Sequence, residues 1–463
     1  MEDVSKINPL GHEPITKLMV RFAVPSIIGM MVSAVYNIAD QIFIGQAVGT
    51  LGNAATNIAF PLAMSCTAIA LLFGIGGASN FNLNLGRGKP ADAIYYVGNA
   101  IVCLIVCGTL LCAVTEMFLH PMLRAFGSPV DVMPYAVEYV RVVALGYPFL
   151  IFSIGGSHLI RADGSPRMAM LINLSGAIVN IFLDAFFIFG LKMGMTGAAL
   201  ATVIGQVLAA SIAFRYVMHY KTVKLERIHL TPDFSRIRQI AAIGLASFIN
   251  QLAMMVVQIT LNNSLKFYGA QSVYGESIPI ACAGIVMKTN QLFFSVVIGL
   301  SQGTQPIESF NYGARNFSRV KKAYLEAAAA GFCVSGLSFI LFQTVPRQII
   351  GLFGNGSEEY FRFGVSFFRT FLFFTWLNCL QPITSTFFTS IGKAKKGMFL
   401  SLTRQILFLL PLIVVLPRIF GIEGILYAGP AADLGAAVTA ILLAYVEFKD
   451  MDRRAAERAK LKA

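Results

Sequence analysis

The chain has 463 residues, of which 56% are hydrophobic and only 13% are charged, and its mean hydropathy is +0.70. This composition excludes a soluble globular or disordered protein and is typical of a chain that crosses a membrane many times. The net charge of +13 could suggest a nucleic-acid partner, but the basic residues cluster in alternate connections between apolar stretches, which argues against one.

Apolar windows of about 20 residues, the length that crosses the hydrocarbon core of a bilayer, recur about twelve times. The predicted spans begin near Leu18, Asn53, Ala93, Met133, Met168, Met195, Ile237, Ile278, Ala323, Phe361, Met398 and Gly424. We therefore expect an all-α polytopic membrane protein. No cleavable signal peptide is expected, because polar residues precede a first apolar stretch that is as long as a membrane helix.

Every second connection is basic, whereas the connections between them are nearly free of charge. The basic groups include Lys17 with Arg21, Arg87 with Lys89, Arg161 with Arg167, Lys221 to Arg238, Arg315 to Lys322, Lys393 to Lys396, and Arg453 with Arg454. Connections with an excess of Lys and Arg stay on the cytoplasmic side. The pattern thus predicts a multi-pass protein of the cell membrane with both termini in the cytoplasm.

Short motifs recur at an offset of about 227 residues, which indicates an internal repeat. Asn84-Leu85-Gly86 returns as Asn311-Tyr312-Gly313, and Gly194 to Gly197 returns as Gly421 to Gly424. Two six-helix bundles in the same orientation would be related by a pseudo-two-fold axis along the membrane normal, which is a transporter architecture. We predict an N-terminal bundle at 1–220, a cytoplasmic linker at 221–235 and a C-terminal bundle at 236–463.

Two acids fall inside predicted spans of the first bundle. Asp184 lies in the apolar run from Gly176 to Gly190, which contains no basic residue, and Asp40 lies late in the first span. A carboxylate in the middle of a membrane helix is disfavoured by about 2.5 to 3.5 kcal/mol, so such residues usually face a wet interior and carry ions or substrate. Asn180 lies four residues before Asp184 and therefore on the same helix face. The alternative is that Asp184 only bonds a neighbouring helix.

The corresponding positions of the second half are Phe408 and Leu412, so the first bundle is expected to hold a polar centre that the second lacks. Pro25 interrupts the first span and could act as a conformational hinge, although a static kink is the alternative. Glu308 lies late in the eighth span, where it could line the cavity or act as a gate residue that pairs with Lys or Arg.

Methionine side chains could form an adaptable lining for varied lipophilic compounds. The stronger alternative is that they are ordinary lipid-facing residues. The candidate cavity residues are Tyr36, Asn37, Gln251, Met255, Met287 and Glu308. The seven Cys residues all fall within predicted spans, and no His cluster, phosphate-binding loop or nucleophile elbow is present in the sequence. We therefore do not expect an enzyme.

The order and spacing of several motifs resemble the multidrug and toxic compound extrusion (MATE) family over nearly the whole chain. The motifs are VPSIIGMMVSAVYNIADQIFIG, LNLGRGK, LIRADGSPRMAM, VNIFLDAFFIF and SQGTQPIESFNYGA. The resemblance implies export of organic compounds, often cationic, by an antiporter that is driven by inward H⁺ or Na⁺ and works by alternating access. It also implies a monomer.

The resemblance to relatives with an ion site in the first bundle implies that the coupling cation, H⁺ or Na⁺, binds at Asp40, Asn180, Asp184 and Thr202. It also implies that Tyr139 lies beside this site. Other relatives also use acids in the seventh and tenth spans. Here those spans carry Asn250, Gln251 and Asn378 but no acid, which favours the first bundle.

Three other functions fit the sequence less well. A lipid-linked saccharide flippase has a similar fold, but it predicts a cavity rich in Arg and Lys, and intramembrane cations are sparse here. A channel needs a continuous polar pore with a filter, and neither is visible in the sequence. A membrane-embedded enzyme needs a catalytic set that His158 alone does not supply.

Overall fold

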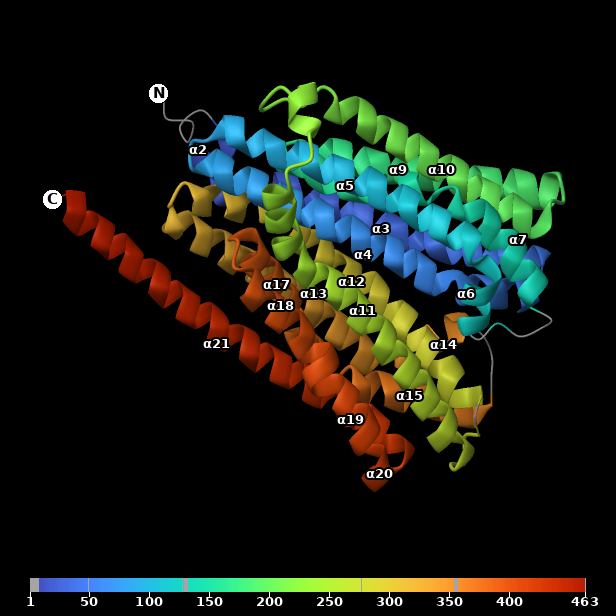
Figure 1. Ribbon diagram of the computed structural model, residues 1–463. Helices are drawn as coiled ribbons and strands as arrows, with labels where there is room; N and C mark the ends of the chain where they lie inside the picture. Colours follow the sequence, from blue (N-terminus) through green and yellow to red (C-terminus); the bar gives the residue numbers. More distant parts are fainter. Residues whose placement is uncertain are drawn as a thin grey trace.

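The computed structural model describes residues 8–48, 50–126, 128, 132–275, 277–353 and 357–462. Within these ranges the regular structure is helical throughout, and the helices form two bundles that lie side by side (Figure 1). The short helix α2 and the C-terminal end of α21, the first and last described helices, lie at the same end of the molecule, which we call the terminal face (Figure 1).

The first bundle comprises six spans. Its helices are α2 (Pro9–His12), α3 (Ile15–Ala47), α4 (Thr50–Gly86), α5 (Pro90–Met117), α6 (Leu119–Ala125), α7 (Met133–Ala144), α8 (Tyr147–Ala162), α9 (Pro166–Asp184), the π-helical η1 (Ala185–Gly190) and α10 (Gly194–Val217). A short 3₁₀ turn, η2 (Arg227–Leu230), lies in the connection to the second bundle.

The second bundle repeats this plan. Its helices are α11 (Phe234–Ala270), α12 (Ser277–Gly313), α13 (Phe317–Thr344), α14 (Pro346–Phe353), α15 (Glu358–Phe371), α16 (Thr375–Asn378), α17 (Leu380–Ser390), α18 (Ala394–Leu402), the π-helical η3 (Thr403–Leu409), α19 (Leu410–Val415), α20 (Pro417–Phe420) and α21 (Ile422–Lys462). In both bundles the fifth span contains a π-helical segment.

The predicted number of spans is confirmed within the described residues. Ten helices are long and apolar enough to cross a membrane, and two bent pairs complete twelve spans. The pairs are α7 with α8, bent by 55°, and α15 with the helices from Thr375 to Ser390, bent by 49°. In the first pair Pro148 lies at the start of α8, where its missing N–H cannot continue the hydrogen bonds of α7.

α7 begins at the predicted Met133, and the other spans begin slightly before their predicted positions. The largest difference is at α13, which begins at Phe317 rather than at Ala323. An apolar window misses the polar first turn of a helix, because residues such as Arg319 and Lys321 lower the local hydropathy although they are helical.

Glycines bring the two bundles into backbone contact in the half of the molecule next to the terminal face. A Cβ on Gly76 would lie 2.0 Å from the Ile240 carbonyl oxygen, and one on Gly244 would lie 1.8 Å from that of Leu72. Contacts of the same kind are made by Gly86, Gly299, Gly303 and Gly313. We call these six residues the glycine seam, because only glycine lets the helix backbones approach so closely.

Polar contacts between the bundles reinforce the seam. The Gln305 amide donates to the Ser79 hydroxyl at 2.8 Å, and the Asn80 amide donates to the carbonyl oxygen of Gln239 at 3.3 Å. The Tyr96 hydroxyl donates to the Gln239 side chain at 2.7 Å. The bundles are therefore closed against each other on the terminal side.

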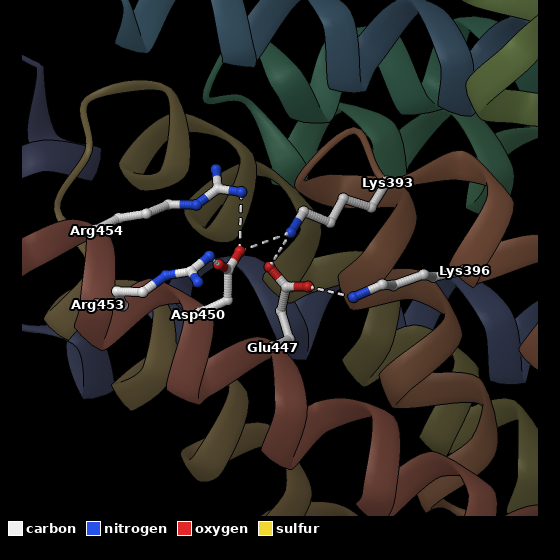
Figure 2. Close-up of polar contacts among 6 residues, drawn as sticks. All are labelled: Lys393, Lys396, Glu447, Asp450, Arg453 and Arg454. Atoms are coloured by element: carbon white, nitrogen blue, oxygen red, sulfur yellow. Dashed lines mark hydrogen bonds and ion pairs between the residues drawn. The ribbon is translucent and has the colours of Figure 1, made fainter.

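An ion-pair network fixes a basic connection of the terminal face to α21 (Figure 2). Glu447 is fully buried and pairs with Lys393 at 2.5 Å and with Lys396 at 2.8 Å. One turn later, Asp450 pairs with Arg453 at 2.7 Å and with Arg454 at 2.8 Å (Figure 2). The buried carboxylate of Glu447 is thus compensated by two ammonium groups, as a buried charge requires.

Candidate functional site

The first part of the site comes from α3. Tyr36 and Asp40 are four residues apart and lie on one face of this helix, and both are half-buried. Among the described residues, Asp40 Oδ1 has no hydrogen-bond partner although it is screened from solvent. Pro25 is buried inside the same helix, fifteen residues nearer the terminal face. The helix therefore carries both an unsatisfied carboxylate and a position where its hydrogen bonding is interrupted.

The second part comes from α9, where Asn180 and Asp184 are 2% and 0% exposed. Asp184 is the last residue of the α-helical part, and the π-helical η1 follows directly. A π-helical segment changes the hydrogen-bond pattern of a helix and is frequent at functional sites. Asp184 Oδ1 has no hydrogen-bond partner among the described residues.

Asn180 connects Asp184 to α10. With its amide oriented to satisfy both neighbours, Asn180 donates to Asp184 Oδ2 at 3.2 Å and accepts from the backbone N–H of Thr202 at 3.2 Å. The Thr202 hydroxyl lies nearby and donates to the Ala198 carbonyl oxygen at 3.0 Å. The amide thus fixes the position of the Asp184 carboxyl group.

The two acids meet between α3 and α9. The carboxyl groups of Asp40 and Asp184 are within hydrogen-bonding reach of each other. Tyr36 lies one helix turn before Asp40, and Tyr139 on α7 is close enough to the acids and to Tyr36 to interact with them electrostatically. Two carboxylates this close inside a protein repel each other unless a proton or a cation lies between them. The structure therefore brings together the five residues that the family resemblance assigns to the ion, and Tyr36 in addition.

Small residues allow this convergence. A Cβ on Gly205 of α10 would lie 2.8 Å from the Gly176 carbonyl oxygen and 3.3 Å from the Asn180 Cβ. A Cβ on Gly29 of α3 would lie 3.3 Å from the Asn173 amide nitrogen of α9. Because these positions lack side chains, α3, α9 and α10 pack closely enough for their polar groups to touch.

The other candidate cavity residues come from three helices. Asn37 lies three residues before Asp40 on α3, is exposed and donates to the Ser33 carbonyl oxygen at 2.8 Å. Gln251 on α11 contacts the Met64 sulfur at 4.0 Å. Met255 and Met287 are half-buried on α11 and α12. These candidates are therefore divided between α3 of the first bundle and α11 and α12 of the second.

Glu308 lies on α12, close to the terminal face, and is 1% exposed. Among the described residues neither of its carboxyl oxygens has a hydrogen-bond partner, and Ser390 and Tyr324 are its polar neighbours. Lys288 lies twenty residues earlier on the same helix, about 30 Å away along the axis, so the two do not pair.

A charged pair that the sequence reasoning missed lies inside the second bundle. Arg404 in η3 donates through Nε to Asp433 Oδ1 on α21 at 2.6 Å, and their side chains are 13% and 0% exposed. The expectation that the second bundle lacks a polar centre was therefore wrong. In the sequence Arg404 and Asp433 are single charges in two apolar runs. Their pairing could not be predicted, because it depends on how η3 packs against α21.

The MatE family model matches residues 25–186 and 247–415, which make up most of the chain. "Multidrug export protein MepA" of Staphylococcus aureus (strain MSSA476) is 25% identical over 439 residues, which cover 94% of each protein. The protein of the same name from Staphylococcus saprophyticus is 23% identical over 448 residues, which cover 96% of each.

Solved structures share the fold. One is described as "Outward-facing conformation of a multidrug resistance MATE family transporter of the MOP superfamily", with a TM-score of 0.89 and 23% identity over 97% of this chain and 99% of that chain. A MOP superfamily transporter from Pyrococcus furiosus, covering 98% of this chain and 99% of its own, also has a TM-score of 0.89 and 23% identity. At this identity the likeness supports the architecture of two six-helix bundles.

Proposed function

The chain belongs to the multidrug and toxic compound extrusion (MATE) family of transporters, and on that premise we propose that it exports lipophilic, often cationic, organic compounds across the cell membrane in exchange for inward H⁺ or Na⁺. The observation that carries the proposal is the contact between Asp40 and Asp184, which come from two different helices. An acid pair that closes around a proton or a cation links ion binding to the positions of α3 and α9.

The donor set suits either ion. The two carboxylates supply the oxygen ligands that hard cations prefer, and the Thr202 hydroxyl oxygen lies near them. The Asn180 amide holds the Asp184 carboxylate in place. A proton shared by the carboxyl groups would remove the same repulsion. In the proposed cycle the ion is the driving substrate of the transporter, and Tyr139 and Tyr36 border the space that it enters.

We assign the terminal face to the cytoplasm, because the basic connections lie there. Closure of the bundles on that side by the glycine seam supports the inference of an outward-facing state. In this state the coupling ion reaches Asp40 and Asp184 from outside. Its binding draws α3 and α9 together, narrows the cavity of the first bundle and displaces the exported compound.

Ion release on the cytoplasmic side then lets the next substrate bind. A ligand drives such a cycle only through its different affinities for the two facing states. We place the organic substrate between the bundles, where Tyr36, Asn37, Gln251, Met255 and Met287 offer polar and adaptable apolar contacts. The transporter is proposed to act as a monomer.

A lipid-linked saccharide flippase fits less well. Recognition of a pyrophosphate needs unpaired basic side chains in the cavity, whereas Arg404, deep in the second bundle, is neutralised by Asp433. The expected substrate is therefore an organic compound rather than a pyrophosphate-linked sugar.

Uptake of a fluorescent organic cation into proteoliposomes tests the proposal, with pH and Na⁺ gradients imposed separately. We expect one gradient to drive uptake by the wild type and to fail with Asp184→Asn or Asp40→Asn, because an amide can neither release a proton nor provide a charged ligand. The gradient that drives uptake names the ion.

The matched control is Asp92→Asn, the same chemical change at an acid whose side chain is 57% exposed and which faces Arg236 at 3.7 Å on the terminal face. This variant should transport like the wild type. Ion-driven uptake that persists in both site variants, at equal amounts of folded protein, would contradict the proposed coupling.

A further inference from the structure

A groove of about 700 Å³ opens between α3 and α9 next to the terminal face. Its walls are formed by Thr16, Lys17, Val20, Arg21, Val24, Pro25 and Ile28 of α3, and by Arg167 and Met170 of α9. The acid pair lies on the same two helices, further from the terminal face. The groove therefore follows the boundary between the two elements that carry the ion site.

The end of the groove at the terminal face is basic. The Lys17 and Arg21 side chains are 68% and 44% exposed, and Arg167, in the first turn of α9, is also exposed. Glu13 lies 3.3 Å from Lys17 and 3.8 Å from Arg21. Glu326 of α13 accepts from the Thr16 hydroxyl of the groove wall at 3.0 Å and lies 3.9 Å from Lys322. Four cations against two carboxylates leave this end with an excess of positive charge.

The rest of the groove is apolar. Val20, Val24 and Ile28 are 61%, 45% and 40% exposed, and their spacing of four residues places them in one row along α3. Lys17 lies nearer the terminal face than these three residues, and Arg21 lies beside the row, between Val20 and Val24 along the helix axis. The positive charge therefore borders the apolar row at its end towards the terminal face.

We propose that the groove binds one phospholipid with an anionic head group, in the leaflet on the side of the terminal face. The phosphate interacts with Lys17, Arg21 and Arg167, and one acyl chain lies along Val20, Val24 and Ile28. A basic site between membrane helices at this depth is suited to anionic lipid head groups. A soluble phosphate would use the charges but leave the apolar row exposed, so the two features together select a lipid.

The bound lipid touches both α3 and α9. Its acyl chain also passes Pro25, where α3 lacks a backbone hydrogen bond. The lipid therefore stabilises the arrangement of α3 against α9 that this structure has, and its loss frees α3 to move. This step is independent of which ion or organic compound the protein transports.

Native mass spectrometry of the full-length protein with equal amounts of phosphatidylglycerol and phosphatidylcholine tests the proposal. We expect one tightly held phosphatidylglycerol per protein. In the triple variant Lys17→Gln, Arg21→Gln and Arg167→Gln its affinity should fall about 100-fold, since each basic side chain near the surface contributes about a fivefold step to anionic lipid binding and three such steps multiply to about 125-fold.

The matched control removes three exposed cations of the same face that lie outside the groove, by Lys224→Gln, Arg227→Gln and Arg238→Gln. It should keep the tightly held lipid. Val24→Trp fills the groove without changing charge and should also lower phosphatidylglycerol binding, which keeps the test decisive if the triple variant does not fold.

Three results would overturn the proposal. Equal retention of phosphatidylglycerol and phosphatidylcholine would remove the role of the charges. Equal losses in the triple variant and in its control would show unspecific attraction. Competition by glycerol 3-phosphate at the same concentration as the lipid would show that the apolar row contributes nothing.

Discussion

The substitution Gly244→Ala tests whether the glycine seam keeps the terminal side closed. An alanine Cβ at this position would lie 1.8 Å from the Leu72 carbonyl oxygen, whereas real Cβ contacts essentially never fall under 3.0 Å. The helices α4 and α11 must therefore separate locally by about 1.2 Å, the difference between these distances. The obstacle is backbone, so no side-chain rotation can relieve it.

Overpacking of this kind costs about 1 to 3 kcal/mol. The cost applies only to the state in which the two helices touch, so it lowers the ratio of closed to open molecules about 5-fold to 150-fold. The variant should therefore expose the terminal side more often than the wild type does. The substitution otherwise stabilises the helix α11 itself, because alanine is a better helix former than glycine.

Thiol labelling measures this shift. Ser79 is 0% exposed and lies at the closed contact, where its hydroxyl accepts from Gln305. In a background without the seven native cysteines, Ser79→Cys should react slowly with a membrane-impermeant reagent added from the terminal side. Adding Gly244→Ala should raise the reaction rate at least 5-fold.

Gly284→Ala on α12 is the control, because a Cβ there meets nothing within 4 Å. It makes the same change in helix propensity without a clash, and it should leave the labelling rate near that of the parent. If Gly244→Ala labels no faster than Gly284→Ala, the seam is not what closes the terminal side.

Three further predictions concern other parts of the molecule. In Gly205→Ala the new Cβ would lie 2.8 Å from the Gly176 carbonyl oxygen and 3.3 Å from the Asn180 Cβ, so Asn180 should be displaced. We expect weaker binding of the proposed coupling ion, measured as a higher ion concentration for half-maximal transport. An unchanged ion dependence would contradict the positioning role of Asn180. Arg404→Met should lower stability by about 3 to 5 kcal/mol by leaving Asp433 buried and unpaired, and adding Asp433→Leu should recover most of the loss of Tm, whereas additive losses would refute the pairing. Burial raises the pKa of the Asp163 carboxyl above its ordinary value of 3.8, although its hydrogen bonds oppose this shift. The contribution of Asp163 to stability is therefore fully present below pH 3.8 and is lost as the pH rises through the raised pKa. Asp163→Asn should flatten the dependence of Tm on pH between these two pKa values. An unaltered slope of Tm against pH would contradict this prediction.

The arrangement of spans was predictable because hydropathy and charge act locally along the chain. Asp184 and Asn180 were recognised for the same reason, since four residues on one helix fix a shared face. The bend at Pro148 was not predicted, because an apolar window continues across it. The pairing of Arg404 with Asp433 could not be predicted either, since twenty-nine residues and a change of helix separate the partners.

The position of α3 suggests how the proposed ion site near its far end could control a closure near its beginning. Ile27 and Ala23 of this helix contact Gly299 and Gly303 of the seam, and Asp40 lies thirteen residues beyond Ile27, about 20 Å along the axis. Pro25 lies between the two seam contacts, at the point where α3 bends most easily. Ion binding that pulls Asp40 towards Asp184 therefore acts on a helix whose other end is held by backbone contact with the second bundle. The strain must appear either at Pro25 or at the seam, and both positions lie on the terminal side. In this view, one helix transmits the occupancy of the first bundle to the contact between the bundles.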